Sequence, residues 1–316
     1  MIVGISGASG KLGRLTVEEA LRHVEPDSLV ITTRTPESLV EFAQKGVTVR
    51  HADFDRPESL PAAFEGIDRM FMISASNGTG KRYDEHQAAI GAAKDAGVER
   101  LVFPSMPRVD DPAHPVGLAA LEYKEAEELV VDSGIPYVIL RDGPYAELHV
   151  IDRFTPVMSS GELRINAREG RAGFVSRKDV ARAAVEAVVG DDVILNRTYD
   201  IAGAELLSYK DLAAIISEET GIEVKVTDLE DDEIHDEALA GGVPKLLAEA
   251  IRGMGRAVRE GYFGVVTDDF RVLTGREQIP VRDVVREHRQ VLIDAAASEK
   301  PTFYAEPAEA ESEASR

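Results

Sequence analysis

The stretch Gly7-Ala8-Ser9-Gly10-Lys11-Leu12-Gly13 lies between a short apolar segment, residues 2–6, and an amphipathic segment, residues 12–23. The first pattern is typical of a buried strand and the second of a helix. A glycine-rich turn between a strand and a helix lets the backbone approach a pyrophosphate, and the helix N-terminus supplies N–H groups and partial positive charge. The GxxGxxG spacing directly after a strand therefore predicts a dinucleotide-binding turn.

Strands and helices alternate through the rest of the first half. We expect strands over residues 2–6, 28–33, 47–51, 69–73, 100–103 and 137–141, and helices over 12–23, 36–44, 58–64, 83–96 and 118–133. The expected strands are continuous apolar runs, as in a sheet that is covered on both faces. The pattern predicts an α/β fold, a doubly wound parallel sheet of Rossmann type, with a smaller α+β C-terminal substrate lobe.

The regularity breaks after Gly143. There we expect an irregular helix over 145–154, strands over 172–175, 196–201 and 223–226, and helices over 177–189, 207–219, 245–260 and 281–296. Ser208 is a suitable N-cap for the helix at 207–219, and Gly221 ends it. We predict an NAD(P)-binding domain over 1–143 and a substrate lobe mainly over 144–296, with segments near 171–202 returning to the first domain. Residues 297–316 read as a disordered acidic tail.

Composition excludes several classes of protein. The 316 residues carry a net charge of −21, which argues against nucleic-acid binding, and they include no cysteine, which excludes disulfides and thiol chemistry. No apolar run has membrane-spanning length and no signal peptide is recognisable, so we expect a cytoplasmic protein without a membrane partner. The scattered histidines predict no metal site. The acidic run at 228–237 lacks calcium-loop spacing and is interpreted as a solvated helix start.

The residue after the second strand indicates which dinucleotide binds. An acidic residue there selects NAD by binding the ribose 2′-hydroxyl, whereas this chain has Arg34, whose guanidinium suits a 2′-phosphate. Lys11 adds positive charge to the same pocket, so NADP(H) is favoured over NAD(H). The alternative for Arg34 is an exposed loop arginine. Asp53 and Phe54 are placed to border the adenine, with a turn role as the alternative for Asp53.

Five segments together resemble the NmrA-like branch of the atypical short-chain dehydrogenase/reductase family, and within it bacterial NADPH-dependent quinone reductases. These segments are residues 7–13, 33–36, 140–147, 174–181 and 273–276. The resemblance implies NADP(H) bound along the carboxyl edge of the sheet. With the observations above, it gives these expected cofactor contacts: Gly7, Ser9, Gly10, Lys11, Leu12, Gly13, Arg34, Asp53, Phe54, Ser74, Ala75, Ser76, Pro104, Lys124, Gly143, Pro144 and Tyr145.

Typical members of that superfamily use a Tyr-x-x-x-Lys pair, and this chain departs from it. Lys124 lies in the corresponding helix, but Ala120 stands where the tyrosine is expected. Tyr123 points about 100° away around the helix and is a poor substitute. The expected catalytic residues are Lys124, Tyr145 and Ser105. Their alternatives are a surface lysine, a core aromatic between lobes and a capping serine.

The missing tyrosine disfavours ordinary alcohol dehydrogenase chemistry, since an unactivated ketone needs a proton donor. A quinone needs little proton donation, because the hydroquinone oxyanion is a fairly stable product. The sequence therefore predicts an NADPH-dependent oxidoreductase that delivers hydride to quinone-like or conjugated carbonyl compounds. Its expected partner is a small aromatic or quinone-like substrate, with a homodimer as a candidate assembly. Two alternatives are a non-catalytic NADP(H) redox sensor with a protein partner and an aromatic polyketide tailoring enzyme, including an oxygenase.

Overall fold

The computed structural model describes residues 1–73 and 82–298. The predicted cofactor contacts Ser74, Ala75 and Ser76, and residues 299–316 of the predicted tail, lie outside these residues. The chain divides into two compact units. The first contains Met1–Gly143, Arg177–Ala202 and Thr267–Gln278, and the second contains Pro144–Ser176, Gly203–Val266 and the segment from Ile279 onward. The sequence analysis places residues 267–278 in the substrate lobe, whereas they group with the first unit.

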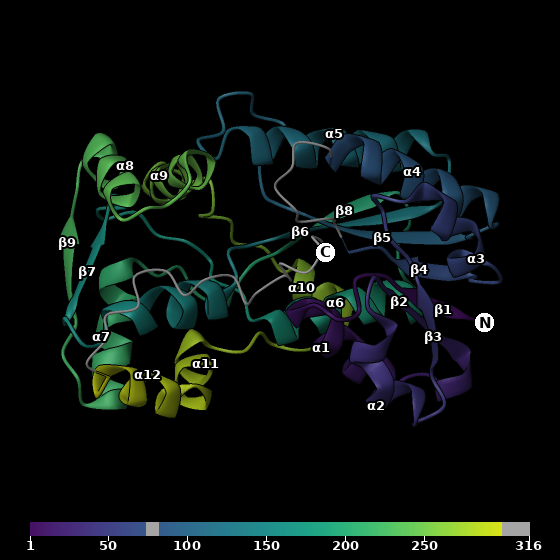
Figure 1. The fold of residues 1–316 in the computed structure, drawn as a ribbon, viewed down its shortest axis with the longest axis horizontal. Coiled ribbons are helices and arrows are strands. Elements are labelled where there is room, and N and C mark those ends of the chain that lie inside the picture. Colours follow the sequence, from purple (N-terminus) through teal and green to yellow (C-terminus); the bar gives the residue numbers. More distant parts are fainter. Residues whose placement is uncertain (74–81, 299–316) are drawn as a thin grey trace, which may run out of the picture. The chain divides into compact units, whose positions relative to one another are not determined.

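A parallel sheet forms the centre of the first unit (Figure 1). In the described part of the chain its strand order is β3-β2-β1-β4-β5-β6-β8. The strands are β1 (Val3–Ile5), β2 (Leu29–Thr33), β3 (Thr48–His51), β4 (Arg69–Phe71), β5 (Arg100–Ser105), β6 (Tyr137–Asp142) and β8 (Arg197–Ile201). The order reverses between β1 and β4, and ligands of such sheets bind at the carboxyl ends of the strands at this switch point. The predicted doubly wound fold is confirmed.

Helices cover both faces of this sheet (Figure 1). One face carries α1 (Lys11–Ala20) and α6 (Arg177–Val189), with α10 (Asp269–Thr274) against α6 and β8, and the other carries α3 (Leu60–Phe64), α4 (Arg82–Asp95) and α5 (Leu118–Asp132). Every residue of β2 and β5 is buried, in agreement with their continuous apolar runs. The helix expected at 36–44 is a 3-10 turn, η2 (Pro36–Leu39), followed by the short α2 (Val40–Ala43).

Two arginines join the amino edge of the sheet to α6. Arg100, the first residue of β5, is 6% exposed and donates to the carbonyl oxygens of Ala187, Val188 and Gly190 at 3.0, 3.1 and 2.7 Å. Arg69, the first residue of β4, donates to Val188 and Val189. These bonds satisfy carbonyl groups that the end of a helix otherwise leaves without partners.

The second unit combines a two-stranded parallel sheet with helices. Its elements are the π-helical turn η4 (Leu148–Asp152), the 3-10 turn η5 (Thr155–Val157), β7 (Glu162–Ile165), α7 (Tyr209–Thr220), β9 (Lys225–Asp228), α8 (Asp231–Ala240), α9 (Lys245–Arg259), α11 (Val281–Glu287) and α12 (Arg289–Ala296). The irregular helix after Gly143 is confirmed, as are the caps of α7: Ser208 accepts from the Asp211 N–H, and Gly221 has φ +75°. Within the described residues, no helix combines the length and hydropathy that crossing a bilayer requires.

Two expectations for this unit are wrong, and one strand is missing from the expected elements. Residues 172–175 form no regular strand, because Ala172 bridges Leu207 while Val175 bridges Tyr145, so the segment changes partners before a ladder develops. The sequence analysis misses β7, whose partner β9 lies about sixty residues later, at a separation that local patterns do not report. The helix expected at 281–296 is interrupted at His288, where φ is −102° and ψ is 8°.

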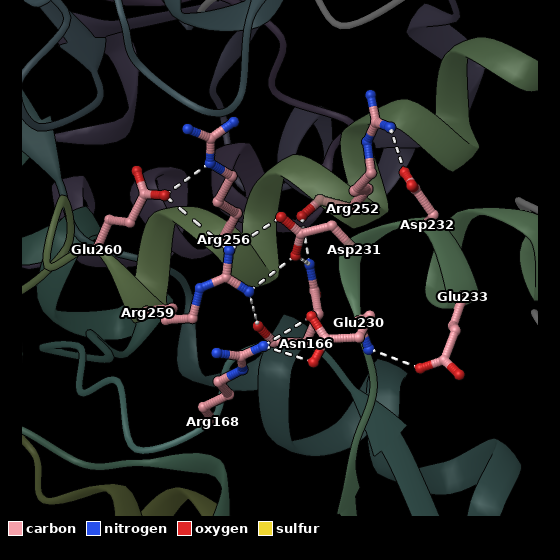
Figure 2. Close-up of polar contacts among 10 residues, drawn as sticks. All are labelled: Asn166, Arg168, Glu230, Asp231, Asp232, Glu233, Arg252, Arg256, Arg259 and Glu260. Atoms are coloured by element: carbon pink, nitrogen blue, oxygen red, sulfur yellow. Dashed lines mark hydrogen bonds and ion pairs between the residues drawn. The ribbon is translucent and has the colours of Figure 1, made fainter.

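The acidic run after β9 begins α8, as interpreted from the sequence (Figure 2). Glu230 and Glu233 form a capping box at its start. Arg259 of α9 donates to both carboxylate oxygens of Asp231 at 2.8 and 2.9 Å, and Asn166 donates to one of them at 2.8 Å. The Arg259 guanidinium lowers the pKa of Asp231 to about 2. Asp231 therefore pairs α8 with α9, while the other acidic residues of the run are exposed, as expected for a solvated helix start.

Candidate dinucleotide-binding site

The glycine turn continues directly from β1 at the switch point. Gly7 adopts φ +61°, a conformation that glycine takes without strain, and its carbonyl accepts the Gly10 N–H at 3.0 Å. Ser6 joins the turn to the neighbouring strand: its N–H donates to Phe71 of β4 at 3.0 Å, and its Oγ accepts the Ile73 N–H at 2.9 Å. The turn thus lies between the carboxyl ends of β1 and β4, where a dinucleotide-binding fold holds its pyrophosphate.

The three glycines differ in their surroundings. A Cβ on Gly13 would lie 2.3 Å from the Gly7 carbonyl oxygen and 2.7 Å from the Ala8 Cα, so a glycine here lets α1 pack against the turn. A Cβ on Gly10 would meet only the Gly7 oxygen, at 3.4 Å, and otherwise open space. Gly7 supplies the turn, Gly13 the close packing, and Gly10 leaves the approach to the backbone free, which fits a bound pyrophosphate.

The start of α1 offers N–H groups to an anion. Gly10 is its N-cap, without a side-chain hydrogen bond, and the first turn contains no acidic residue. Lys11 is exposed at this end, whereas the Leu12 side chain is buried, so Leu12 offers a ligand its backbone alone. Helix N-termini of this kind favour phosphate groups through their N–H groups and dipole.

Arg34 lies beyond the end of β2, beside this turn. Its neighbour Thr33 donates from Oγ1 to the Oγ of Ser9 at 2.8 Å, which ties the end of β2 to the glycine turn. Arg34 is exposed and has no hydrogen-bond or ion-pair partner among the described residues. Both interpretations of Arg34 therefore predict an exposed side chain, and the structure adds that no described carboxylate forms an ion pair with it.

Asp53 and Phe54 follow β3. Asp53 accepts the Asp55 N–H at 3.2 Å and its carboxylate lies 3.9 Å from the Arg56 guanidinium, so the side chain stabilises a turn. Phe54 is half-buried and packs against the core between the sheet and α3 and α4. The turn role of Asp53 is confirmed, and its contact with adenine stays a prediction.

The expected catalytic groups of the first unit lie on β5 and α5. Pro104 and Ser105 end β5, both buried, and the Ser105 Oγ has no hydrogen-bond partner among the described residues, so it caps no described helix. Lys124 is part-exposed and pairs with Glu128 one turn along α5. The Glu128 carboxylate raises the pKa of Lys124, so the ammonium is charged at neutral pH. The side chain of Tyr123 points in a different direction from that of Lys124.

Tyr123 faces α4 instead. The Arg82 guanidinium lies 5.1 Å from the centre of its ring, and Arg82 also pairs with Glu122 at 3.3 Å. Ala120 is 2% exposed, so its position is filled by core packing. Neither residue supplies the phenol that the typical superfamily pair requires.

The remaining expected contacts lie where the sequence passes from the first unit to the second. Gly143 ends the first stretch of unit one, and its N–H donates to Ile201 of β8 at 2.9 Å. Pro144 and Tyr145 begin the second unit, where Tyr145 forms a bridge with Val175. The roles of Pro144 and Tyr145 beside a cofactor stay predictions.

His114 and His149 are among the buried histidines of the described chain. His114 is buried in the loop between β5 and α5, where its Nδ1 accepts the Val116 N–H at 3.2 Å. His149 is buried in the second unit, where its Nδ1 lies 2.5 Å from the Tyr209 hydroxyl and its ring is tilted by 49° against that of Phe174. Burial lowers the pKa of His114, so its ring is neutral at neutral pH.

Sequence reasoning missed several polar groups around the glycine turn. They are the Ser6 hydroxyl, the Thr33 hydroxyl and Arg14, which binds the carbonyl oxygen of Ser38 at 2.5 Å. Hydropathy patterns treat Ser and Thr in strands as neutral, so they give no signal for these bonds. The sequence signal for these bonds is limited to Arg14, an arginine directly after the third glycine.

Comparisons with known proteins agree with this geometry. A family model described as NAD(P)H-binding matches residues 7–190. Quinone oxidoreductase 2 of Escherichia coli is 30% identical over 250 residues, which cover 79% of this chain and 85% of the relative. An NmrA-like family domain-containing oxidoreductase of Aspergillus flavus is 25% identical and covers 90% of this chain and 93% of its own length.

A solved structure gives the same result. The NADPH-dependent quinone oxidoreductase of Escherichia coli, in complex with NADPH, superimposes with a TM-score of 0.84 at 27% identity, covering 90% of this chain and 99% of that one. The family match begins at Gly7, the first glycine of the turn described above. The chain therefore belongs to the NAD(P)H-binding family, as an oxidoreductase of the quinone reductase and NmrA-like type.

Proposed function

We propose that this oxidoreductase uses NADPH to reduce quinone-like or conjugated carbonyl compounds. The observation that carries the proposal is the pairing of an intact dinucleotide turn with a site that lacks a tyrosine at position 120. Bound NADPH supplies a hydride, and one proton from water completes the two-electron reduction of a quinone to a hydroquinone. Because the hydroquinone oxyanion is stable, the protein's task is to bind and orient the ring.

Arg34 supports the preference for NADPH over NADH. Its guanidinium is exposed beside the glycine turn, and no described carboxylate pairs with it. An arginine at this place accepts a 2′-phosphate through charge-assisted hydrogen bonds, whereas an acidic residue would repel it. The NADPH that the related Escherichia coli quinone oxidoreductase binds agrees with this assignment.

Lys124 and Ser105 are the proposed polar groups of the active site. The charged Lys124 ammonium orients the nicotinamide ribose or a substrate oxygen, and Ser105 offers a hydroxyl at the carboxyl end of β5 that no described group engages. Tyr145 borders the nicotinamide. The names of the relatives favour catalysis over the non-catalytic sensor or the oxygenase.

The test is steady-state oxidation of NADPH and of NADH with a panel of quinones, conjugated carbonyls and simple ketones. We expect turnover with quinones, little with simple ketones, and a higher kcat/KM with NADPH. In Arg34→Gln the KM for NADPH should rise roughly tenfold while the KM for NADH changes little. Tight NADPH binding without turnover on any acceptor would refute the proposed activity, and equal use of both cofactors would refute the preference.

A further inference from the structure

Arg14 connects the start of α1 to the turn that carries Arg34. Its Nη2 donates to the carbonyl oxygen of Ser38 at 2.5 Å. Ser38 in turn binds Thr35: its Oγ donates to the Thr35 carbonyl oxygen at 2.7 Å, and its N–H donates to the same oxygen at 3.0 Å. Because Thr35 directly follows Arg34, Arg14 holds the C-terminal side of this turn.

The N-terminal side of the turn is held separately. The Thr33 hydroxyl donates to the Ser9 Oγ at 2.8 Å and accepts the Thr35 N–H at 3.2 Å. Neutral hydroxyl and backbone groups therefore fix one side of Arg34, whereas a charged guanidinium fixes the other. Removing Arg14 loosens only the second side, where the two bonds from Ser38 to Thr35 remain.

Arg14 also pairs with the carboxylate of Glu41 on α2. The hydrogen bonds from the Glu41 backbone and from Arg14 lower the pKa of Glu41, so this carboxylate is ionised at neutral pH. One guanidinium binds both the Ser38 carbonyl oxygen and Glu41, which places the carboxylate next to the Arg34 turn. An unneutralised carboxylate at this place would repel a 2′-phosphate, as the acidic residue of NAD-specific folds does.

We propose that Arg14 is a positioning residue for recognition of the ribose 2′-phosphate: it fixes the Arg34 turn and neutralises Glu41. The inference rests on the proposed preference for NADPH. It assigns to Arg14 no contact with the reacting atoms. Its effect is confined to ligands that carry the 2′-phosphate.

The test measures binding of 2′,5′-ADP and 5′-ADP to the full chain by isothermal titration calorimetry. In Arg14→Gln, affinity for 2′,5′-ADP should fall roughly tenfold while affinity for 5′-ADP changes less than about twofold. Adding Glu41→Gln should restore 2′,5′-ADP affinity to within about threefold of the unsubstituted chain. Arg22→Gln is the matched control, because Arg22 follows the same helix and its exposed side chain pairs with Glu19.

The outcomes separate the inference from the proposal beneath it. If the unsubstituted chain prefers 2′,5′-ADP and Arg14→Gln retains that preference, the role of Arg14 is refuted and the NADPH preference stands. Equal loss for both nucleotides would mean that Arg14 only supports the glycine turn. A loss that Glu41→Gln does not restore would refute the neutralisation of Glu41. If the unsubstituted chain binds both nucleotides equally, the NADPH preference and the inference both fall.

Discussion

Replacing each of two glycines by alanine should separate stability from cofactor binding. In Gly13→Ala the added Cβ would lie 2.3 Å from the Gly7 carbonyl oxygen and 2.7 Å from the Ala8 Cα. Both atoms belong to the backbone, so α1 must move away from the turn. Overpacking of this kind costs about 1–3 kcal/mol, which corresponds to a fall in Tm of roughly 2–5 °C for a chain of this size.

Gly10→Ala is the matched substitution. Its backbone, with φ −71° and ψ 166°, is accessible to alanine, and the new Cβ meets only the Gly7 oxygen at 3.4 Å. The folded chain should lose at most about 1 kcal/mol through the weaker N-cap. The methyl group would stand on the open side of the helix N-terminus, so the Kd for NADPH should rise tenfold or more, at about 1.4 kcal/mol per tenfold.

Differential scanning calorimetry gives the Tm of each variant, and the fluorescence of bound NADPH gives the Kd. The expected pattern is a lower Tm in Gly13→Ala, and an almost unchanged Tm with weaker NADPH binding in Gly10→Ala. Unaltered NADPH affinity in Gly10→Ala would show that the pyrophosphate does not approach this backbone. An unaltered Tm in Gly13→Ala would show that the packing of α1 on the turn is not tight.

Three further predictions concern other parts of the chain. Lys124→Met should lower kcat/KM for quinones roughly tenfold or more without changing the Tm, whereas the exposed Lys94→Met on α4 should change neither quantity in steady-state assays. Arg100→Met should cost about 2–4 kcal/mol in urea unfolding, because three carbonyl groups of the α6 end lose a charged donor, and leave NADPH affinity unchanged. Asp231→Asn should lower the free energy of unfolding by about 1–2 kcal/mol near neutral pH. The pKa of Asp231 is about 2 in the folded chain and 3.8 ordinarily, so the ionised carboxylate stabilises the fold above pH 3.8. In urea unfolding, the difference between the two chains should disappear as the pH falls through about 2.

The sequence predicts the first unit well because its signals are local. Most strands before Gly143 are short apolar runs next to a helical repeat, and the observed ends mostly differ from the predicted ones by one to three residues. The second unit depends on pairings between distant segments. The β7 strand has one described partner, β9, and residues 172–175 bridge two different segments, so neither has a repeat that a sequence window detects.

In the candidate site, too, the sequence predicts residues with local signals and misses contacts between distant segments. The sequence supplies the glycines, Arg34 and Lys124, because each is recognisable by type and spacing. It does not distinguish a glycine that packs from one that leaves the backbone open, since that difference lies in the surroundings of a missing Cβ. The bonds from Thr33 to Ser9 and from Arg14 to Ser38 join segments about 24 residues apart and follow no period.

The burial of Ala120 narrows the range of substrates that this site is expected to reduce. If position 120 were exposed, the hydroxyl of a neighbouring tyrosine could take over the role of the missing tyrosine. Ala120 instead lies in the core, and Tyr123 faces Arg82 on α4. Among the described side chains of α5, the charged Lys124 is then the proposed group beside the reaction, and a lysine held protonated by Glu128 stabilises an oxyanion more readily than it releases a proton. An active site of this kind suits substrates whose reduced form is a stable anion, which is why we propose quinones rather than simple ketones as its acceptors.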